Sequence, residues 1–144
     1  MFAPAKIDMG SAWGKSDGVE ICIAGLTIDG KKPATFVVRG FAGGAVQSST
    51  VAGAPEKATV RLGKEVRFVA GMIKDSRDNT IRGWRGGWSI PFADLGLEPK
   101  PGLKIAFNMC AFYSELGTWH CWEGTLTDNW QLAQAGTIQL GETQ

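Results

Sequence analysis

The sequence contains a single histidine, His120, and only one tyrosine. Most nucleophilic triads use a histidine as general base, so the chain has little material for one. P-loop, HExxH and nucleophile-elbow patterns are also absent. His120 lies in a strand-like stretch where alternation points it away from Trp119 and Cys121, and we expect it to face solvent or a polar neighbour. These absences argue against the common catalytic designs.

The sequence also lacks an excess of positive or negative charge. The 15 Lys and Arg residues and 14 Asp and Glu residues are scattered along the chain and give a net charge of +1. Nucleic acids and anionic membranes select clustered basic residues, so we expect neither as a partner. No apolar run approaches the roughly 20 residues that a membrane-spanning helix needs, and the first residues lack the apolar core of a signal peptide.

The three cysteines include no CxxC pair, which argues against a zinc site. Cys110 and Cys121 are placed symmetrically about Glu115 and Leu116, so a hairpin centred there would bring them opposite one another. Two states stay open for this pair: a disulfide, or two reduced thiols packed as small apolar residues. We expect Cys22 to be a buried free thiol.

Long helical patterns are missing too. Twenty glycines and six prolines divide the 144 residues into short pieces rich in Val, Ile, Thr, Phe and Trp. Residues 1–144 therefore form one all-β domain, and we expect an antiparallel β-sandwich of jelly-roll or immunoglobulin type. The predicted strands are Val19–Ala24, Ala34–Arg39, Ala45–Val51, Thr59–Leu62, Glu65–Ile73, Arg82–Ile90, Lys104–Tyr113, Gly117–Trp122 and Gly136–Leu140.

The stretch GGWSIPFADLGLEPKPG predicts how two of these strands are connected. Pro91 removes a ladder donor and ends the first strand. Phe92–Leu95 is then about one helical turn, and Gly96 can adopt the left-handed conformation that stops it. Lys100–Gly102 forms the next turn and starts the following strand.

The most polar segment is IKDSRDNTI, residues 73–81. One interpretation is a solvated hairpin loop. The other is an ion-binding loop, because Asp75, Asp78 and Asn79 carry hard oxygen ligands suited to a structural calcium ion. The full EF-hand spacing is absent.

The six tryptophans are the strongest indication of function in this sequence. An indole face offers a flat apolar partner to the C–H surface of a sugar ring, while neighbouring polar groups bond its hydroxyls. Tryptophans beside polar loops therefore suggest carbohydrate binding, whereas core packing is the alternative for each of them. Trp84 and Trp88 most resemble core residues, and the six are Trp13, Trp84, Trp88, Trp119, Trp122 and Trp130.

Three stretches resemble carbohydrate-binding module family 9 and its DOMON-related relatives. GGWSIPFADLGLEPKPGLKIAFNMC is similar to that family's Trp-containing strand, Ile-Pro-Phe/Trp-x-x-Leu-Gly segment and Pro-Gly turn. SDGVEICI resembles its Asp-x-Val-Glu strand, which follows a loop tryptophan. LGTWHCWEGTLTDNWQLAQAGTIQL resembles its closing region. The three occur in the family's order, and the resemblance implies a β-sandwich.

The resemblance also implies a binding site. Trp13 matches the tryptophan before the Asp-x-Val-Glu strand, although it lies one residue further from Glu20 than the family pattern, and Glu20 matches the polar residue that bonds sugar hydroxyls. Trp122 best matches the second tryptophan that sandwiches the sugar, with Trp119 and Trp130 as rivals. Arg39 and Arg82 are candidate hydroxyl donors that match no family motif.

Family members bind plant-type glucan, xylan or saccharide ends, often with structural calcium, and are usually non-catalytic appendages of secreted enzymes. The resemblance therefore implies carbohydrate as partner and an extracellular or periplasmic location. The family has further strands before the Asp-x-Val-Glu segment, whereas about a dozen residues precede it here. We expect either a piece of a longer protein or a differently covered sheet edge, and an uncovered edge would favour a homodimer.

Two other functions stay open. One is a small glycan-active hydrolase that pairs Glu20 with Glu123 or Asp128. The other is a structural or interaction domain whose sugar site is empty, including a haem-binding version with His120 and Met72 or Met109 as axial ligands.

Overall fold

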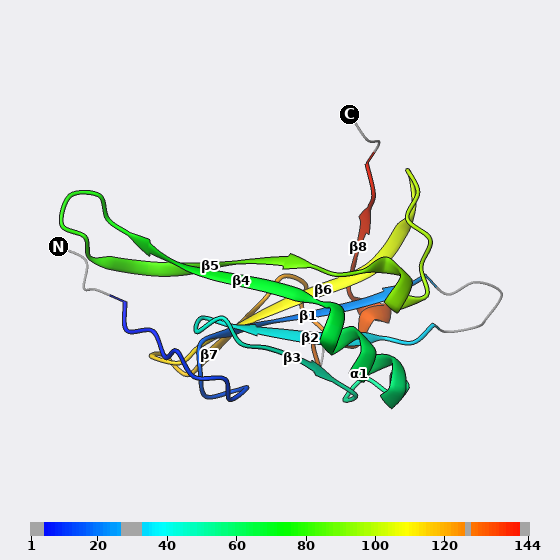
Figure 1. Cartoon of the computed structure of the whole chain (residues 1–144), viewed down its shortest axis with the longest axis horizontal. Coiled ribbons are helices and arrows are strands. Elements are labelled where there is room, and N and C mark those ends of the chain that lie inside the picture. Colours follow the sequence, from blue (N-terminus) through cyan, green and yellow to red (C-terminus); the bar gives the residue numbers. More distant parts are fainter. Residues whose placement is uncertain (1–4, 27–32, 126–127, 142–144) are drawn as a thin grey trace.

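The computed structural model describes residues 5–26, 33–125 and 128–141. Within these ranges the chain consists mainly of β-strands, with one α-helix and two short 3-10 turns (Figure 1). The elements are β1 (Gly18–Gly25), β2 (Phe36–Phe41), β3 (Val46–Ser49), α1 (Glu56–Glu65), β4 (Arg67–Lys74), β5 (Ile81–Ser89), η1 (Phe92–Leu95), β6 (Lys104–Tyr113), β7 (Thr118–Cys121), η2 (Leu132–Gln134) and β8 (Gly136–Gln139).

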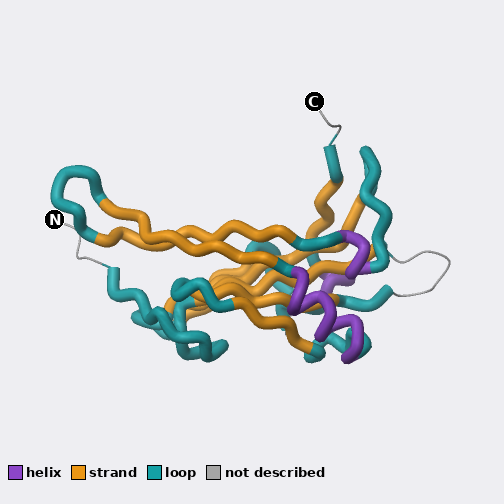
Figure 2. The backbone as a smooth tube through the Cα atoms, in the orientation of Figure 1, coloured by secondary structure: helices purple, strands orange, loops and turns teal. Residues whose placement is uncertain are grey.

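The strands form two antiparallel sheets. The larger sheet has the order β3-β2-β1-β6-β7, and β8 also pairs with β6, while β4 and β5 pair only with each other among the described residues. The long β4–β5 hairpin lies over one face of the larger sheet (Figure 2). The predicted all-β sandwich is therefore confirmed.

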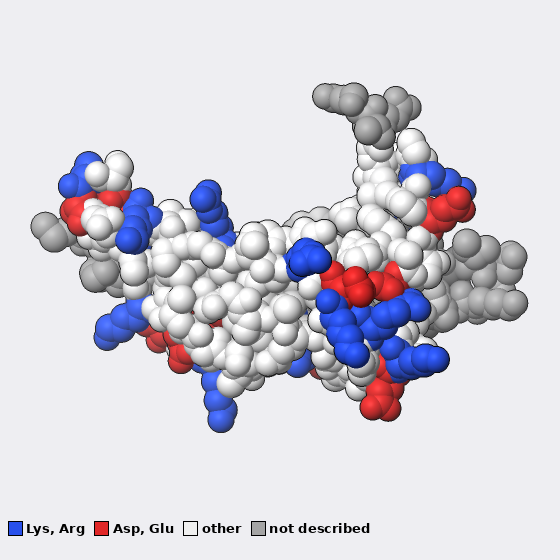
Figure 3. Space-filling model, viewed as in Figure 1, with Lys and Arg blue, Asp and Glu red and all other residues white. Residues whose placement is uncertain are grey.

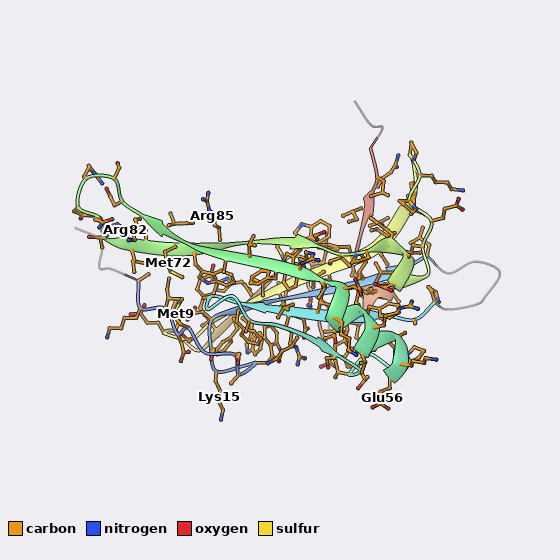
Figure 4. The ribbon with its side chains drawn as sticks, viewed as in Figure 1. Met9, Lys15, Glu56, Met72, Arg82 and Arg85 are labelled. Carbon is orange, nitrogen blue, oxygen red and sulfur yellow. The ribbon has the colours of Figure 1, made fainter. Side chains whose placement is uncertain are left out.

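The main core lies between these two sheets. Alternation sends Ile21, Val38 and Ile105 to the face of the larger sheet that packs against Trp88 of the hairpin. At Gly40 the sheets approach so closely that an added Cβ would lie 2.6 Å from the ring of Phe68. Side chains of the β4–β5 hairpin also alternate between its two faces: Met72 points toward the larger sheet, and Arg85 points away from it (Figure 4).

The strand predicted at Thr59–Leu62 is wrong, because these residues belong to α1. Val60 and Leu62 alternate with Thr59 and Arg61, which imitates a strand, but a helical period also fits. Thr59 and Leu62 are buried, Glu56 lies in the first turn and Lys64 in the last, where their charges suit the helix dipole. The neighbouring strand accordingly starts at Arg67 rather than at Glu65. The other eight predicted strands are present, with ends shifted by a residue or two.

The connection after β5 is as predicted. Phe92–Leu95 forms a single 3-10 turn, and Gly96 ends it with φ 69°, a left-handed conformation that glycine adopts without strain. Asp94 of this turn forms a 2.6 Å ion pair with Arg61 of α1. The pair joins the helix to the end of the sandwich.

On the face shown in Figure 3, charged side chains gather over α1, at the tip of the β4–β5 hairpin and over the connection that leads into β6. The middle of this face carries few charges, in line with the near-neutral composition. In the described part of the chain, no helix is long and apolar enough to cross a membrane.

Candidate functional site

A cleft of about 530 Å³ opens on the face of the larger sheet that points away from the hairpin. Ile21 and Val38 face the hairpin, so their strand neighbours Glu20 and Arg39 face this cleft. Its volume lies within the range of about 300–1,000 Å³ that is typical of small-molecule sites. Tryptophan side chains and a pair of opposite charges line it, among them Trp13, Trp119, Trp130, Glu20, Arg39 and Asn129.

Residues in direct register across neighbouring strands form three rows on the side of the larger sheet that faces the cleft. The rows are two residues apart along each strand, about 6.6 Å. The central row consists of Arg39, Glu20, Cys110 and Cys121; the aromatic row consists of Phe41, Gly18, Phe112 and Trp119; the buried row consists of Val37, Cys22 and Asn108. The central row lines the cleft, whereas only Trp119 of the other two rows does so.

The aromatic row forms one end of the cleft together with Trp13, which lies in the turn before β1. The Trp13 and Trp119 ring centroids are 5.0 Å apart at an angle of 67°, an edge-to-face contact. Trp119 also packs on Phe112 at 4.6 Å, and Trp13 contacts Phe41 at 6.4 Å. Since Trp13 and Trp119 touch, a sugar ring does not fit between them, but their exposed surfaces form one continuous apolar wall.

The central row holds a buried ion pair. Arg39 Nε lies 2.7 Å from Glu20 Oε2, and the two side chains are only 17% and 4% exposed. The Arg39 guanidinium also lies 5.0 Å over the Trp13 ring, a cation–π arrangement. Its two terminal nitrogens have no hydrogen-bond acceptor among the described residues and are available to a ligand in the cleft.

Asn129 reaches the same carboxylate from the loop before η2. Its Nδ2 lies 3.3 Å from both Glu20 Oε1 and Cys22 Sγ, and its main-chain oxygen accepts a hydrogen bond from Asn108 Nδ2 at 3.2 Å. The Asn129 Oδ1 atom is buried and has no partner within the described ranges. An unpaired buried acceptor is costly, so it favours a ligand that brings a donor.

Two of the three thiols in this region are held in their protonated form. Burial, followed by the neighbouring carboxylate of Glu20, raises the pKa of Cys22. Burial and a hydrogen bond with Cys121 raise the pKa of Cys110. Cys121 is exposed, and all three cysteines are reduced in this structure.

Five of the seven predicted ligand-binding residues line this cleft. Trp130 lies beyond the buried row, where it packs against the apolar cluster of Cys22, Val37 and Leu132. It therefore stands at the opposite end of the floor from Trp13 and Trp119. The five are Trp13, Glu20, Arg39, Trp119 and Trp130.

The other two predicted residues lie elsewhere. Trp122 follows the cleft residue Cys121 by one position, so alternation takes it to the other side of the sheet. There its ring contacts Phe107 at 5.5 Å and covers Gly136, where an added Cβ would lie 2.8 Å from the indole. His120 also points away from the cleft and is exposed, with its ring 5.0 Å from that of Tyr113.

Arg82 lies at the start of β5, near the tip of the β4–β5 hairpin (Figure 4). Its Nη2 is 3.4 Å from Asp75 Oδ2 and 3.3 Å from Asp78 Oδ2. It thus belongs to the polar loop and is remote from the cleft in the fold.

Arginine side chains bind the carboxylates of the polar loop, residues 73–81. Arg77 binds Asp75 through both carboxylate oxygens, at 3.0 and 2.8 Å, and holds the pKa of Asp75 well below its usual range. Asn79 adopts a left-handed conformation, φ 58°, inside the same turn. The described residues contain no group of three or more His, Cys, Asp or Glu side chains arranged to hold a metal ion. A calcium ion at Asp75, Asp78 and Asn79 stays a prediction.

The sequence analysis missed Asn129, which lines the cleft, and Asn108, which is buried beneath it and holds the Asn129 loop. Asn108 is fully buried, and its side chain bonds the main chain of Glu123 and Asn129. The sequence pattern could have indicated Asn108. In the predicted strand Lys104–Tyr113, alternation places this amide on the same face as the apolar residues Ala106, Cys110 and Phe112. Asn129 sits in an irregular loop, where no periodicity could have indicated its direction.

Glu20, Glu123 and Asp128, the carboxylates considered for a hydrolase, differ in their burial and in their position relative to the cleft. Both oxygens of Glu20 are engaged, by Arg39 and by Asn129. Asp128 is exposed at the rim of the cleft, and Glu123 is not among the residues lining it. This arrangement offers no free buried acid to protonate a glycosidic oxygen.

No protein-family model and no curated protein sequence matches this chain. A solved structure from Bacteroides uniformis, described as "a putative carbohydrate-binding protein", aligns with 95% of this chain at 17% sequence identity and a TM-score of 0.49. The alignment covers 66% of that protein, so this chain spans just under two thirds of its length.

Proposed function

We propose that the cleft binds a saccharide without cleaving it. The observation that carries the proposal is the floor itself: the buried Glu20–Arg39 pair lies between an aromatic wall of Trp13 and Trp119 and the indole of Trp130. Aromatic faces pack on the C–H surface of sugar rings, while the polar groups between them match hydroxyls.

The charges of the cleft favour a neutral ligand. Glu20 and Arg39 neutralise each other on the floor, and the Arg39 guanidinium already occupies the Trp13 face where a cationic ligand would stack. A hydroxylated ligand can use both sides of this pair, because hydroxyls donate as well as accept. It can accept from the Arg39 terminal nitrogens and donate to oxygens such as Asn129 Oδ1.

The length of the floor favours an oligosaccharide over a single sugar. The aromatic row and the buried row flank the central row on this face of the sheet and are four residues apart along β6, about 13 Å. Trp119, from the aromatic row, and Trp130, which packs against the buried row, both line the cleft. Two linked pyranose rings can therefore lie across the central row and reach Trp130. Together with the family resemblance, this supports plant-type polysaccharides or their ends as ligands, and a function outside the cytoplasm.

Trp119 and Trp122 provide a matched test. They are 48% and 49% exposed and lie three residues apart, but only Trp119 lines the cleft. We expect wild-type protein to bind cellobiose, xylobiose or a soluble glucan or xylan in isothermal titration calorimetry, with a dissociation constant in the micromolar to millimolar range. Trp119→Ala should weaken that binding about tenfold or more, whereas Trp122→Ala should leave it unchanged.

Two results would contradict the proposal. If no saccharide binds the wild-type protein, the cleft has another ligand. If both tryptophan variants bind equally well, the saccharide binds outside the cleft. Release of reducing sugar from a polysaccharide, lost in Glu20→Gln, would instead support the hydrolase.

A further inference from the structure

Cys110 and Cys121 are partners in the β6–β7 ladder, as their spacing predicted. The main-chain nitrogen of Trp122 donates to the oxygen of Met109 at 2.8 Å, which makes Met109 and Trp122 a hydrogen-bonded pair. Hydrogen-bonded and non-hydrogen-bonded pairs alternate along an antiparallel ladder, so Cys110 and Cys121 are a non-hydrogen-bonded pair. In such pairs the Cα atoms are about 4.5 Å apart.

The neighbouring pairs agree with this register. On one side of the cysteines, Asn108 Oδ1 accepts a hydrogen bond from the main chain of the opposite residue, Glu123, at 3.1 Å. On the other side, the rings of Phe112 and Trp119 are 4.6 Å apart. Side chains of consecutive non-hydrogen-bonded pairs therefore lie on the cleft face, and Cys110 and Cys121 both line the cleft between these two pairs.

We propose that Cys110 and Cys121 are a redox site that closes reversibly into a disulfide on the cleft floor, with a low-molecular-weight disulfide as oxidant. A Cα separation near 4.5 Å falls inside the range of about 4.4–6.8 Å found in disulfides. Closure therefore needs side-chain rotation and no movement of the strands.

Cys22 takes no part in this reaction. It belongs to the buried row, opposite Asn108, and is completely shielded from solvent. Its sulfur is engaged by Glu20 Oε1 at 3.7 Å and Asn129 Nδ2 at 3.3 Å.

The reaction starts at Cys121, because this thiol is exposed whereas Cys110 is 3% exposed. The Cys121 thiolate attacks oxidised glutathione, forms a mixed disulfide and releases one glutathione thiolate. The Cys110 sulfur then attacks the Cys121 sulfur and forms the protein disulfide. The bond between Cys121 and glutathione breaks, and the Cys110 proton passes to the departing glutathione thiolate. One protein disulfide forms, two protein thiols are oxidised, and two glutathione molecules are produced.

The expected consequence concerns β7, a four-residue strand at the edge of the larger sheet that carries Trp119. A disulfide ties this edge to the central strand β6 and shortens the unfolded chain by a closed loop between residues 110 and 121. We expect the oxidised protein to melt about 5–10 °C higher than the reduced protein.

The test incubates the full chain in oxidised and reduced glutathione, blocks remaining thiols with iodoacetamide after unfolding, and maps the peptides by mass spectrometry. We expect a Cys110–Cys121 peptide pair, alkylation of Cys22 only, and reversal by dithiothreitol. The exposed-site variant Cys121→Ser should lose both the disulfide and the rise in melting temperature, whereas Cys22→Ser should keep them.

Three results would overturn the proposal: three alkylated thiols after oxidation, a stable glutathione adduct on Cys121 with Cys110 still alkylated, or a disulfide that includes Cys22 or joins two chains. These readouts involve no saccharide, so they do not depend on the proposed function.

Discussion

Arg39 and Glu20 face each other on adjacent strands β2 and β1 and form a 2.7 Å ion pair on the cleft floor. The pair holds a carboxylate and a guanidinium where saccharide hydroxyls would need an acceptor and a donor. It also sets a stability requirement, because neither charge can lose its partner without being left in a poorly hydrated environment.

We therefore expect Arg39→Leu to destabilise the fold by about 3 kcal/mol, since it leaves Glu20 buried and unpaired. The double variant Arg39→Leu with Glu20→Leu should recover much of this loss, because no unpaired charge remains. Urea denaturation followed by circular dichroism measures both. Equal losses in the single and double variants would show that the cost comes from packing rather than from the unpaired charge.

The cavity-forming variant Leu62→Ala tests the helix that the sequence analysis missed. Leu62 is completely buried in the main core, so we expect its truncation to cost about 3 kcal/mol. Val60→Ala, on the exposed side of the same helix, is the control and should change stability little. Similar losses for both would contradict a helix with Leu62 on its inner face.

Gly40→Ala tests the close approach of the two sheets. The added methyl group would lie 2.6 Å from the Phe68 ring and 2.7 Å from Trp88, so these rings must move. We expect a destabilisation of about 2 kcal/mol by overpacking. Chemical denaturation measures it, and a variant as stable as the wild-type protein would show that the sheets are further apart there.

The ion pair between Asp75 and Arg77 makes the stability of the polar loop depend on pH. Hydrogen bonds from Arg77 lower the pKa of this carboxyl in the folded state. The pairing therefore stabilises the folded loop above the unfolded pKa of aspartate, and the effect is lost as the pH falls through the lowered folded value.

We expect Asp75 to stay ionised at about pH 3, where an ordinary aspartate is mostly protonated. A carboxyl carbon titration by NMR measures this, and Arg77→Gln should raise the midpoint. An ordinary midpoint in the wild-type protein would mean that the pairing does not persist in solution.

Most of the secondary structure could be predicted from local sequence patterns. Alternation in Lys104–Tyr113, the strand end at Pro91 and the left-handed stop at Gly96 are local properties, and each is found where it was predicted. The position of Cys110 opposite Cys121 also followed from the sequence, because a short hairpin fixes its own register. The helix α1 was missed because Thr59–Leu62 fits both periods, and only burial of Leu62 against the core selects one.

Which tryptophans line the same cleft depends on long-range packing. Trp119 lies in β7 and lines the cleft, whereas Trp122 follows the strand and packs on Phe107 on the other face. Alternation separates the two residues, but it does not say which face carries the cleft. Whether a face becomes a cleft or is covered depends on what packs on it, and the hairpin covers one face while the loops around Trp13 and Trp130 border the other. Such packing joins residues far apart in the chain, so no local pattern encodes it.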